Sequence, residues 1–224
     1  MKWFLDLFSC LLGRKILMAL TGIFLILFLT VHLTGNLQLL KHDGGKAFNT
    51  YAEFMGNNPL IQIISKGNFL FIILHVLWAL MLTISNRKAR GPVGYANPNK
   101  KSVWASRNMG ILGTIILIFL VIHIRHFYFF SHFGSLPTQM YDGHEAKDLY
   151  GQVIFWFQKD WYVALYVFSM IALSFHLWHG FTSAFQTLGL NHKKYNPVIN
   201  FVGKAYAILV PAGFALIPIV IFFS

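Results

Sequence analysis

Residues 15–40 read KILMALTGIFLILFLTVHLTGNLQLL, an apolar run that carries a single imidazole, that of His32. A helix rises about 1.5 Å per residue and the hydrocarbon core of a bilayer is about 30 Å thick, so this run is long enough to cross a membrane. The run is too continuous for a barrel strand, whereas a helix satisfies its own backbone hydrogen bonds in lipid. It therefore predicts a transmembrane helix, and it raises the question of why that helix contains a histidine.

The composition of the whole chain agrees with a membrane protein. Of its 224 residues, 56% are hydrophobic and only 11% are charged, which is not the composition of a soluble domain. Further apolar runs of spanning length follow the first one. We expect transmembrane helices at about residues 15–40, 66–86, 105–130, 161–187 and 201–223. The sequence thus predicts an all-α integral membrane protein with a single membrane domain, residues 1–224.

The first fourteen residues do not read as a signal peptide, because they contain no small-residue cleavage site. We expect residues 1–14 to be an uncleaved cytoplasmic lead-in that forms an interfacial helix. Cys10 is the only cysteine, so the chain has no internal disulfide, no C-x-x-C-H motif and no cysteine cluster for iron and sulfur. Any cofactor must therefore be held by other side chains.

The basic residues predict the orientation. They gather in the N-terminal segment and in the loops at 87–107 and 189–204, whereas the other two loops hold most of the acidic residues. Positive charge stays on the cytoplasmic side, so we expect a cytoplasmic N-terminus and a C-terminus across the membrane. The net charge of +11 is then mostly a topology signal. We expect the lipid bilayer and no nucleic acid as a partner, because no soluble domain presents a basic face.

Four of the five expected helices carry a histidine deep inside the apolar run: His32, His75, His123 and His176. Ionisable groups inside a membrane are costly unless they are partnered, so four of them call for a common cause. His32 and His123 lie about 18 residues from the inner end of two outward-running helices, and His75 and His176 lie about 12 residues from that end in two inward-running helices. The histidines therefore form two depth-matched pairs, one nearer each membrane face.

Two neutral imidazoles that face each other from different helices are what a six-coordinate haem b needs, because the porphyrin supplies the other four nitrogens. A lone buried histidine is more often a hydrogen-bonded packing residue, but two matched pairs favour haem ligation. We expect two haem b groups in a four-helix bundle, one held by His32 and His123 and the other by His75 and His176. Gly35 would give a macrocycle or a neighbouring helix room to approach.

His126 and His179 each follow a paired histidine by three residues and so share a helix side with it. Either member of each pair could face the cofactor, and chelation of one metal ion by both is an alternative. We favour the first member as the ligand, and the second as a contact to a propionate or a quinone or as a residue of the interface. Arg125 has two equally weighted roles, pairing with a haem propionate or extending to the outer headgroups.

Four blocks of the sequence resemble the cytochrome b558-type membrane anchor of bacterial succinate dehydrogenase/fumarate reductase, a five-helix subunit with two haems. The likeness extends over nearly the whole chain, and the blocks together are more specific than any one of them. They are LGRKILMALTGIFLILFLTVHLTGNLQLL at 12–40, NTYAEFMGNNPL at 49–60, NRKARGPVGY at 86–95 and FHLWHGFTSAFQTLGLN at 175–191.

The resemblance implies that His75 and His176 hold the haem nearer the catalytic subunits and that His32 and His123 hold the distal haem. It also implies a flavoprotein and an iron–sulfur subunit on the cytoplasmic face, menaquinone as the electron partner, and the bacterial inner membrane as the location. This chain has no nucleotide-binding glycine motif and no cysteine ligands, so it would perform no dicarboxylate chemistry itself.

The resemblance also suggests contacts outside the histidine pairs. Glu53 resembles a glutamate that serves quinol oxidation in one branch of the family, and a solvated loop carboxylate is the alternative. Ser9 and Arg14 are candidates for the propionates of the cytoplasmic haem or for a proximal quinone pocket.

Other functions compete with this interpretation. A dihaem anchor of a hydrogenase or formate dehydrogenase would share the histidine pairs without the four blocks. A histidine-relay transporter would need charges inside the spans, where Arg125 is the only strong one. The sequence leaves open the direction of electron flow, the type of quinone and the dimerisation of the complex.

Overall fold

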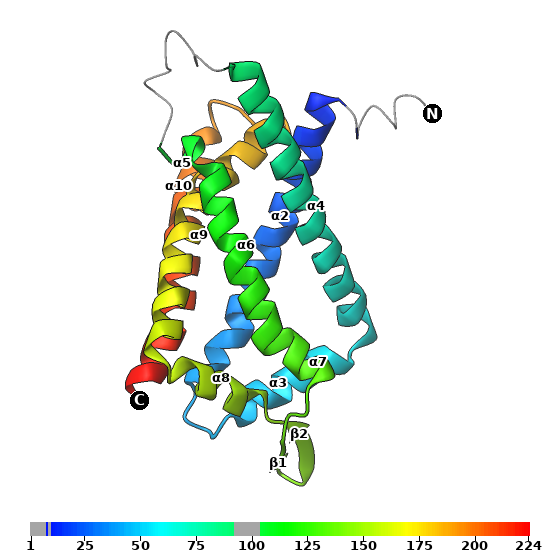
Figure 1. The fold of residues 1–224 in the computed structure, drawn as a ribbon, viewed down its shortest axis with the longest axis vertical. Coiled ribbons are helices and arrows are strands. Elements are labelled where there is room, and N and C mark those ends of the chain that lie inside the picture. Colours follow the sequence, from blue (N-terminus) through cyan, green and yellow to red (C-terminus); the bar gives the residue numbers. More distant parts are fainter. Residues whose placement is uncertain (1–7, 9, 92–103) are drawn as a thin grey trace.

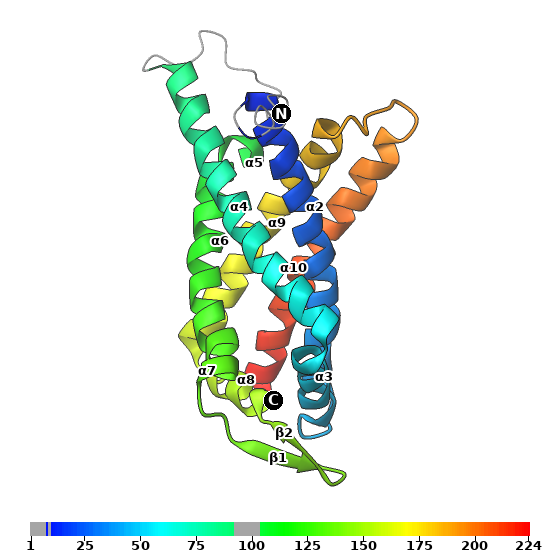
Figure 2. The same ribbon diagram turned by 90° about the vertical axis from the view of Figure 1, so that its right-hand side faces the viewer.

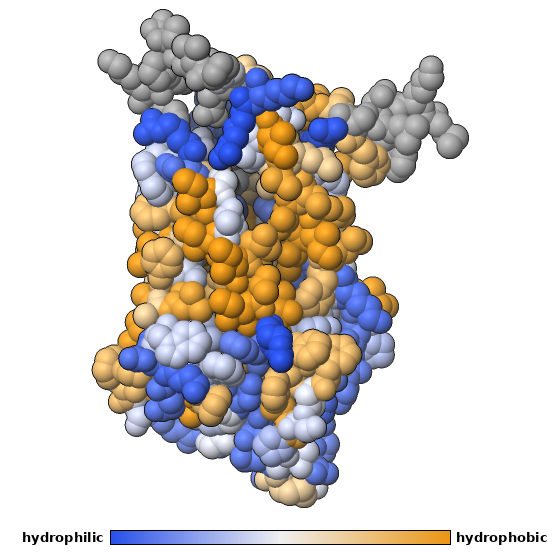
Figure 3. All heavy atoms as spheres, viewed as in Figure 1, coloured by the Kyte–Doolittle hydropathy of each residue, from blue (hydrophilic) through white to orange (hydrophobic). Residues whose placement is uncertain are grey.

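The computed structural model describes residue 8 and residues 10–91 and 104–224, and it shows a bundle of long helices (Figure 1). Five helices of the described part are long and apolar enough to cross a membrane. They comprise Leu11–Leu40, Pro59–Ala89, Met109–Phe133, Asp160–Thr187 and Asn196–Phe223. On the face shown in Figure 3, a hydrophobic band separates two more polar ends. The chain is therefore a multi-pass, all-α membrane protein, as its composition predicts.

Local signals set where the first two long helices begin. Helix α2 (Leu11–Asn36) starts after Cys10, whose Sγ accepts a hydrogen bond from the backbone N–H of Gly13. Helix α4 (Pro59–Arg90) begins well before the expected residue 66, because the Asn58 side chain caps it and a proline occupies its first position. Both caps add turns that the apolar run alone does not predict.

The third span is one continuous helical segment that contains an irregular turn. Helix α6 (Met109–His123) passes into the π-helical segment η2 (Ile124–Phe129) and then into α7 (Phe130–Phe133). The short helix α5 (Trp104–Arg107) precedes it, so the expected single helix from residue 105 is wrong at its start. A π-helical turn inside an α-helix is rare and occurs frequently at functional sites.

Helix α9 (Asp160–Thr187) lies at the centre of the packing, and α10 (Asn196–Phe223) runs alongside it (Figure 2). Helices α2 and α6 also pack against α9, whereas α4 packs mainly against α2. Residues of α9 such as Tyr162, Met170 and Leu177 are buried in the main apolar cluster. Helices α2, α4, α6 and α9 thus surround a common interior, and α10 supports it from the side of α9.

A small cap that the sequence analysis does not anticipate covers one end of the bundle, next to the end of α10 (Figure 1). We call this the cap end, and the opposite end, where α2 begins, the N-terminal end. The cap includes a short segment η1 that continues α2, two helices and an antiparallel hairpin. Its elements are η1 (Leu37–Leu40), α3 (Lys46–Asn57), β1 (Thr138–Tyr141), β2 (His144–Lys147) and α8 (Leu149–Phe157).

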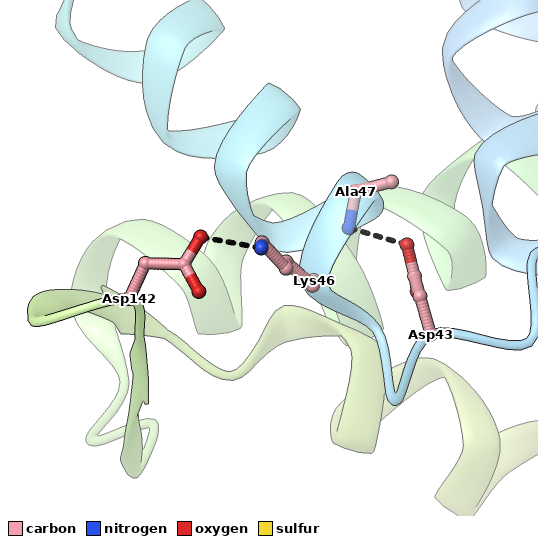
Figure 4. A network of polar contacts seen from close by, with 4 residues as sticks. All are labelled: Asp43, Lys46, Ala47 and Asp142. Atoms are coloured by element: carbon pink, nitrogen blue, oxygen red, sulfur yellow. Dashed lines mark hydrogen bonds and ion pairs between the residues drawn. The ribbon is translucent and has the colours of Figure 1, made fainter.

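Polar contacts tie the start of α3 to its surroundings. Asp43 accepts a hydrogen bond of 2.9 Å from the backbone N–H of Ala47, and Lys46 pairs with Asp142 at 2.5 Å (Figure 4). The Asp142 carboxylate raises the pKa of the Lys46 ammonium through this hydrogen bond. Because Asp142 lies in the turn of the hairpin, the pair joins the hairpin to α3.

The buried side-chain amide of Asn49 forms hydrogen bonds that connect the elements of the cap. The Asn49 side chain is 1% exposed and donates to the Tyr141 hydroxyl at 2.9 Å and to the Asp148 carboxylate at 3.0 Å. Its oxygen accepts from the backbone N–H of Tyr150 at 2.8 Å. Asn49 therefore connects α3, the hairpin and the start of α8.

Candidate functional site

The structure brings the four membrane histidines together in the two pairs that their depths predict. The ring centroids of His75 on α4 and His176 on α9 lie 6.4 Å apart, with an angle of 65° between the planes. Those of His32 on α2 and His123 on α6 lie 5.8 Å apart at 87°. We call these the N-terminal-end pair and the cap-end pair. Each pair joins two different helices across the interior of the bundle.

Helix α2 shapes the N-terminal-end pair. The Thr21 hydroxyl lies 3.1 Å from His75 Nδ1, and it is also within hydrogen-bond distance of the Leu17 carbonyl, to which it donates at 2.9 Å. Because this hydroxyl has only one proton, its bond with His75 is best made with Nδ1–H as the donor. That tautomer leaves the lone pair of His75 on Nε2, which is the form in which imidazole binds a metal.

Two glycines leave space beside the rings of this pair. A Cβ placed on Gly22 of α2 would lie 3.6 Å from Cε1 of His75, and one on Gly113 of α6 would lie 4.0 Å from Cε1 of His176. Any longer side chain at these positions would project into the region of the rings. The two glycines therefore line a cradle around the pair on the two helices that do not supply its histidines.

Aromatic rings surround the cap-end pair. Phe28 stacks on His32 at 5.1 Å, and Phe214 of α10 lies 5.7 Å from the same ring. On the other side, His123 Nδ1 lies 2.8 Å from the Tyr166 hydroxyl. Asn36 donates at 2.7 Å to the backbone carbonyl of His32, and its amide lies at a longer 3.4 Å from His32 Nδ1. His123 is thus held by a short hydrogen bond and His32 mainly by stacking.

The same spacing separates the two pairs along three helices. Gly22, beside His75, precedes His32 by ten residues on α2, and Gly113, beside His176, precedes His123 by ten residues on α6. On α9, His176 follows the Tyr166 that contacts His123, again by ten residues. At about 1.5 Å per residue, the pairs lie about 15 Å apart along the bundle.

The geometry of both pairs fits two axial ligands of one metal ion. A metal–imidazole bond is about 2 Å long, so two imidazoles on opposite sides of an ion have centroids about 6 Å apart. Within the part of the chain that the structure describes, no three His, Cys, Asp or Glu side chains form a group that could hold a metal ion. A pair supplies only two coordination positions, so a metal there needs a further ligand such as a macrocycle.

The Nδ1 atom of His176 differs from that of His75. It is buried, and no atom of the described residues forms a hydrogen bond with it. A buried polar atom without a partner costs about 1–3 kcal/mol, and the cost falls when a ligand supplies one. The ring of His176 therefore has a polar atom whose hydrogen-bonding requirement is not met within the part of the chain that the structure describes.

The second histidines of the H-x-x-H motifs differ in their surroundings. His126 stacks on Trp156 with centroids 3.8 Å apart, and its Nδ1 lies 3.1 Å from the Tyr162 hydroxyl. His179 is partly buried, one turn from His176 toward the N-terminal end of the bundle. Arg125 is exposed and lies over the Phe129 ring at 4.9 Å, a placement that agrees with its interfacial alternative.

The remaining candidates lie away from the two pairs or outside the described residues. Glu53 is on α3 rather than in a loop, and its carboxylate lies 2.9 Å from His144 Nε2 of the hairpin. Arg14 is near the start of α2, where its Nε donates to the Phe8 carbonyl at 3.2 Å. Ser9 lies outside the described residues. Gly35 faces the ring of Tyr51 of α3, so the space that it leaves is filled by a neighbouring helix.

The sequence analysis missed several residues that shape the pairs: Thr21, Gly22, Gly113, Tyr162, Tyr166 and Phe214. The two glycines were detectable, because both outward-running helices contain a glycine ten residues before the paired histidine. The tyrosines and the threonine gave no such signal, since hydroxyl residues are common in membrane helices and their partners depend on how the helices pack.

No protein-family model, no curated protein and no solved structure matches this chain. The case for the site therefore rests on the residues and their geometry.

Proposed function

We propose that this chain is the dihaem cytochrome b anchor of a succinate dehydrogenase/fumarate reductase, in which it passes electrons between an iron–sulfur subunit and a membrane quinone. The observation that carries the proposal is the meeting of four membrane histidines in two pairs at ligand spacing. The four sequence blocks that resemble this family support the identity of the complex. The chain contributes electron transfer and leaves the dicarboxylate chemistry to its partners.

In this proposal, His75 and His176 hold one haem b, and His32 and His123 hold the other. Each haem, when bound, supplies an iron that changes its charge by one electron. The two imidazoles of each pair would hold the iron from two different helices, which would leave it no need of a further ligand during electron transfer. Thr21 and Tyr166 orient the imidazoles of His75 and His123, and Gly22 and Gly113 leave room for a macrocycle.

The separation of the pairs suits a path across the membrane. An axial distance of about 15 Å covers about half of a 30 Å hydrocarbon core, so two sites divide the crossing into shorter steps. The N-terminal end is cytoplasmic in this proposal, because Arg14, Lys15, Arg87 and Lys88 lie there. The flavoprotein and iron–sulfur subunits would dock at that end, and the N-terminal-end haem would exchange electrons with them first.

Several charged and polar residues are assigned to the periphery of the sites. Arg14 lies seven residues before Thr21, on the same face of α2, and would reach the propionates of the N-terminal-end haem. His126 and Glu53 lie toward the cap end, where menaquinone would exchange electrons and protons. The acidic and basic residues of the cap keep that end in contact with water.

The experiment is a pyridine haemochromogen measurement on the purified chain and on four variants, His32→Ala, His75→Ala, His123→Ala and His176→Ala. We expect two haems b in the wild type. Loss of one spectral component is expected in the His32 and His123 variants, and loss of the other in the His75 and His176 variants. His132→Ala is the matched control, because His132 is exposed on α7 and lies in the same helical segment as His123. A folded wild type that binds no haem would refute the proposal.

A further inference from the structure

A chain of four polar side chains connects the cap-end pair to the cap. His123 Nδ1 lies 2.8 Å from the Tyr166 hydroxyl, which lies 3.4 Å from the Tyr162 hydroxyl. The Tyr162 hydroxyl in turn lies 3.1 Å from His126 Nδ1. Two residues of α6 and η2 thus face two residues of α9, and the hydroxyls link the imidazoles in series.

The polarity of this chain is determined by its ends, because each hydroxyl donates one hydrogen. If His123 Nδ1 carries a proton, it donates to Tyr166, Tyr166 donates to Tyr162, and Tyr162 donates to an unprotonated Nδ1 of His126. If His126 Nδ1 carries the proton instead, every bond reverses. His123 then accepts at Nδ1 and carries its proton on Nε2, the atom that would bind iron.

Because the two tyrosines are buried, the hydrogen bonds of the series all point one way or all point the other way. Tyr162 is 0% exposed and Tyr166 is 6% exposed, so water does not replace a mismatched bond. His126 is fixed at the other end by Trp156, whose ring is stacked on it with only 12° between the planes. The tautomer at one end of the chain therefore determines the tautomer at the other.

We propose that His126, acting through Tyr162 and Tyr166, is a positioning residue that holds His123 in the tautomer with a free Nε2. This inference rests on the proposed function, because it concerns the ligand role of His123. It gives a role to the second histidine of the H-x-x-H motif, which lies beside the pair without belonging to it. The π-helical turn η2 begins at the residue after His123 and contains His126, so the irregularity coincides with this element.

The two histidine pairs differ in how the hydroxyl that accepts from the imidazole Nδ1–H is itself bonded. At the N-terminal end, the Thr21 hydroxyl accepts from His75 and donates its own proton to the backbone of its helix. At the cap end, Tyr166 also donates onward, but to another side chain, so Tyr162 and His126 polarise the hydrogen bond between Tyr166 and His123 and strengthen Tyr166 as an acceptor. A better acceptor at Nδ1–H makes the imidazole a stronger electron donor and favours oxidised iron. Tyr166 would therefore lower the reduction potential of a haem held by the cap-end pair.

The test is a redox titration of the purified dihaem protein, followed by the absorbance of each haem. For Tyr166→Phe we expect two haems and a shift of the cap-end haem toward the reduced form by roughly tenfold, equal to about 59 mV for one electron. Tyr162→Phe and His126→Phe should shift the same haem in the same direction by less. Thr21→Val should shift only the haem at the N-terminal end.

Tyr206→Phe is the matched control, because the half-buried hydroxyl of Tyr206 on α10 donates to the Ile26 carbonyl and lies 3.1 Å from the Thr30 hydroxyl rather than beside an imidazole of either pair. Loss of only the cap-end haem in Tyr166→Phe, with both haems kept in Tyr206→Phe, would also support the inference. Unchanged potentials in the Tyr166, Tyr162 and His126 variants would overturn it. A wild type without haem would instead refute the proposed function, so the two failures are distinguishable.

Discussion

Gly22 of α2 lies against the ring of His75 of α4, and a Cβ at this glycine would stand 3.6 Å from the Cε1 atom of the imidazole. That distance is an ordinary van der Waals contact, so alanine fits at position 22. A larger side chain occupies the cradle beside the N-terminal-end pair. Small and large substitutions at Gly22 therefore test two properties separately, the packing of α2 against α4 and the ability of the pair to hold a large ligand.

Replacing Gly22 with leucine tests the cradle. We expect Gly22→Leu to lose the haem at the N-terminal end and to keep the one at the cap end, because the extra carbons occupy the space beside His75. The haem content per chain, measured with pyridine haemochromogen, reports the result. Gly22→Ala is the control and should keep both haems. Two haems in the leucine variant would show that no macrocycle occupies this space.

Gly203 of α10 tests the packing of the fifth helix. A Cβ at this position would lie 2.7 Å from Cδ1 of Phe181, a buried ring of α9 that has little room to move. We expect Gly203→Ala to destabilise the chain by about 1–3 kcal/mol through overpacking. Thermal unfolding in detergent measures the change. Gly180→Ala is the matched control, because its Cβ would meet open space, and it should not lower the stability.

Asn49 tests the cap. Asn49→Leu removes the acceptor of the Tyr150 backbone N–H and one of the hydrogen bonds of the Asp148 carboxylate, which keeps those from Gln139 and Gly151. We expect a cost of about 1–3 kcal/mol for each buried group left unsatisfied. Hydrogen exchange should rise in α3 and in the hairpin and stay unchanged in the middle of α9. Glu53→Gln, which alters a more exposed ion pair of the cap, should have a smaller effect.

Cys10 tests the orientation of the chain in the membrane. It is the only cysteine of the sequence, and it is exposed at the start of α2. A membrane-impermeant maleimide added to intact spheroplasts should leave it unlabelled and should label it after lysis, because we expect the N-terminal end to be cytoplasmic. The variant Cys10→Ser with Asp142→Cys moves the thiol to the hairpin and should give the opposite pattern. Labelling of Cys10 in intact spheroplasts would show that the N-terminal end lies outside the cytoplasm, which is the opposite of the expected orientation.

Sequence alone predicted the five spans and the two histidine pairs, because both depend on local or periodic properties. A membrane helix needs only a long apolar run, and the depth of a residue follows from its distance to the end of that run. The start of α4 was less predictable, because the cap at Asn58 begins the helix at Pro59, and Lys66, Gly67 and Asn68 separate its first turns from the long apolar run. The cap itself was missed, since short amphipathic elements have weak signals and its organising amide, Asn49, depends on distant partners.

The environment of the histidines could not be predicted from sequence either. Whether Tyr166 or Thr21 reaches an imidazole depends on how two helices are rotated about their axes, and the sequence does not specify that rotation. The same holds for Arg125, whose exposed position over Phe129 follows from the direction of η2. Long-range packing decides these contacts, whereas apolar runs decide the spans.

The ten-residue interval from Gly22 to His32 recurs from Gly113 to His123, and both intervals lie within unbroken α-helix. The rise of an α-helix is set by its backbone hydrogen bonds, and helices adapt to thicker or thinner bilayers mainly by tilting. A tilt of the bundle therefore leaves the spacing of the two pairs along the helices unchanged. If the two pairs hold haems as proposed, a tilt of the bundle would leave the distance for electron tunnelling between them unchanged, and with it the transfer rate.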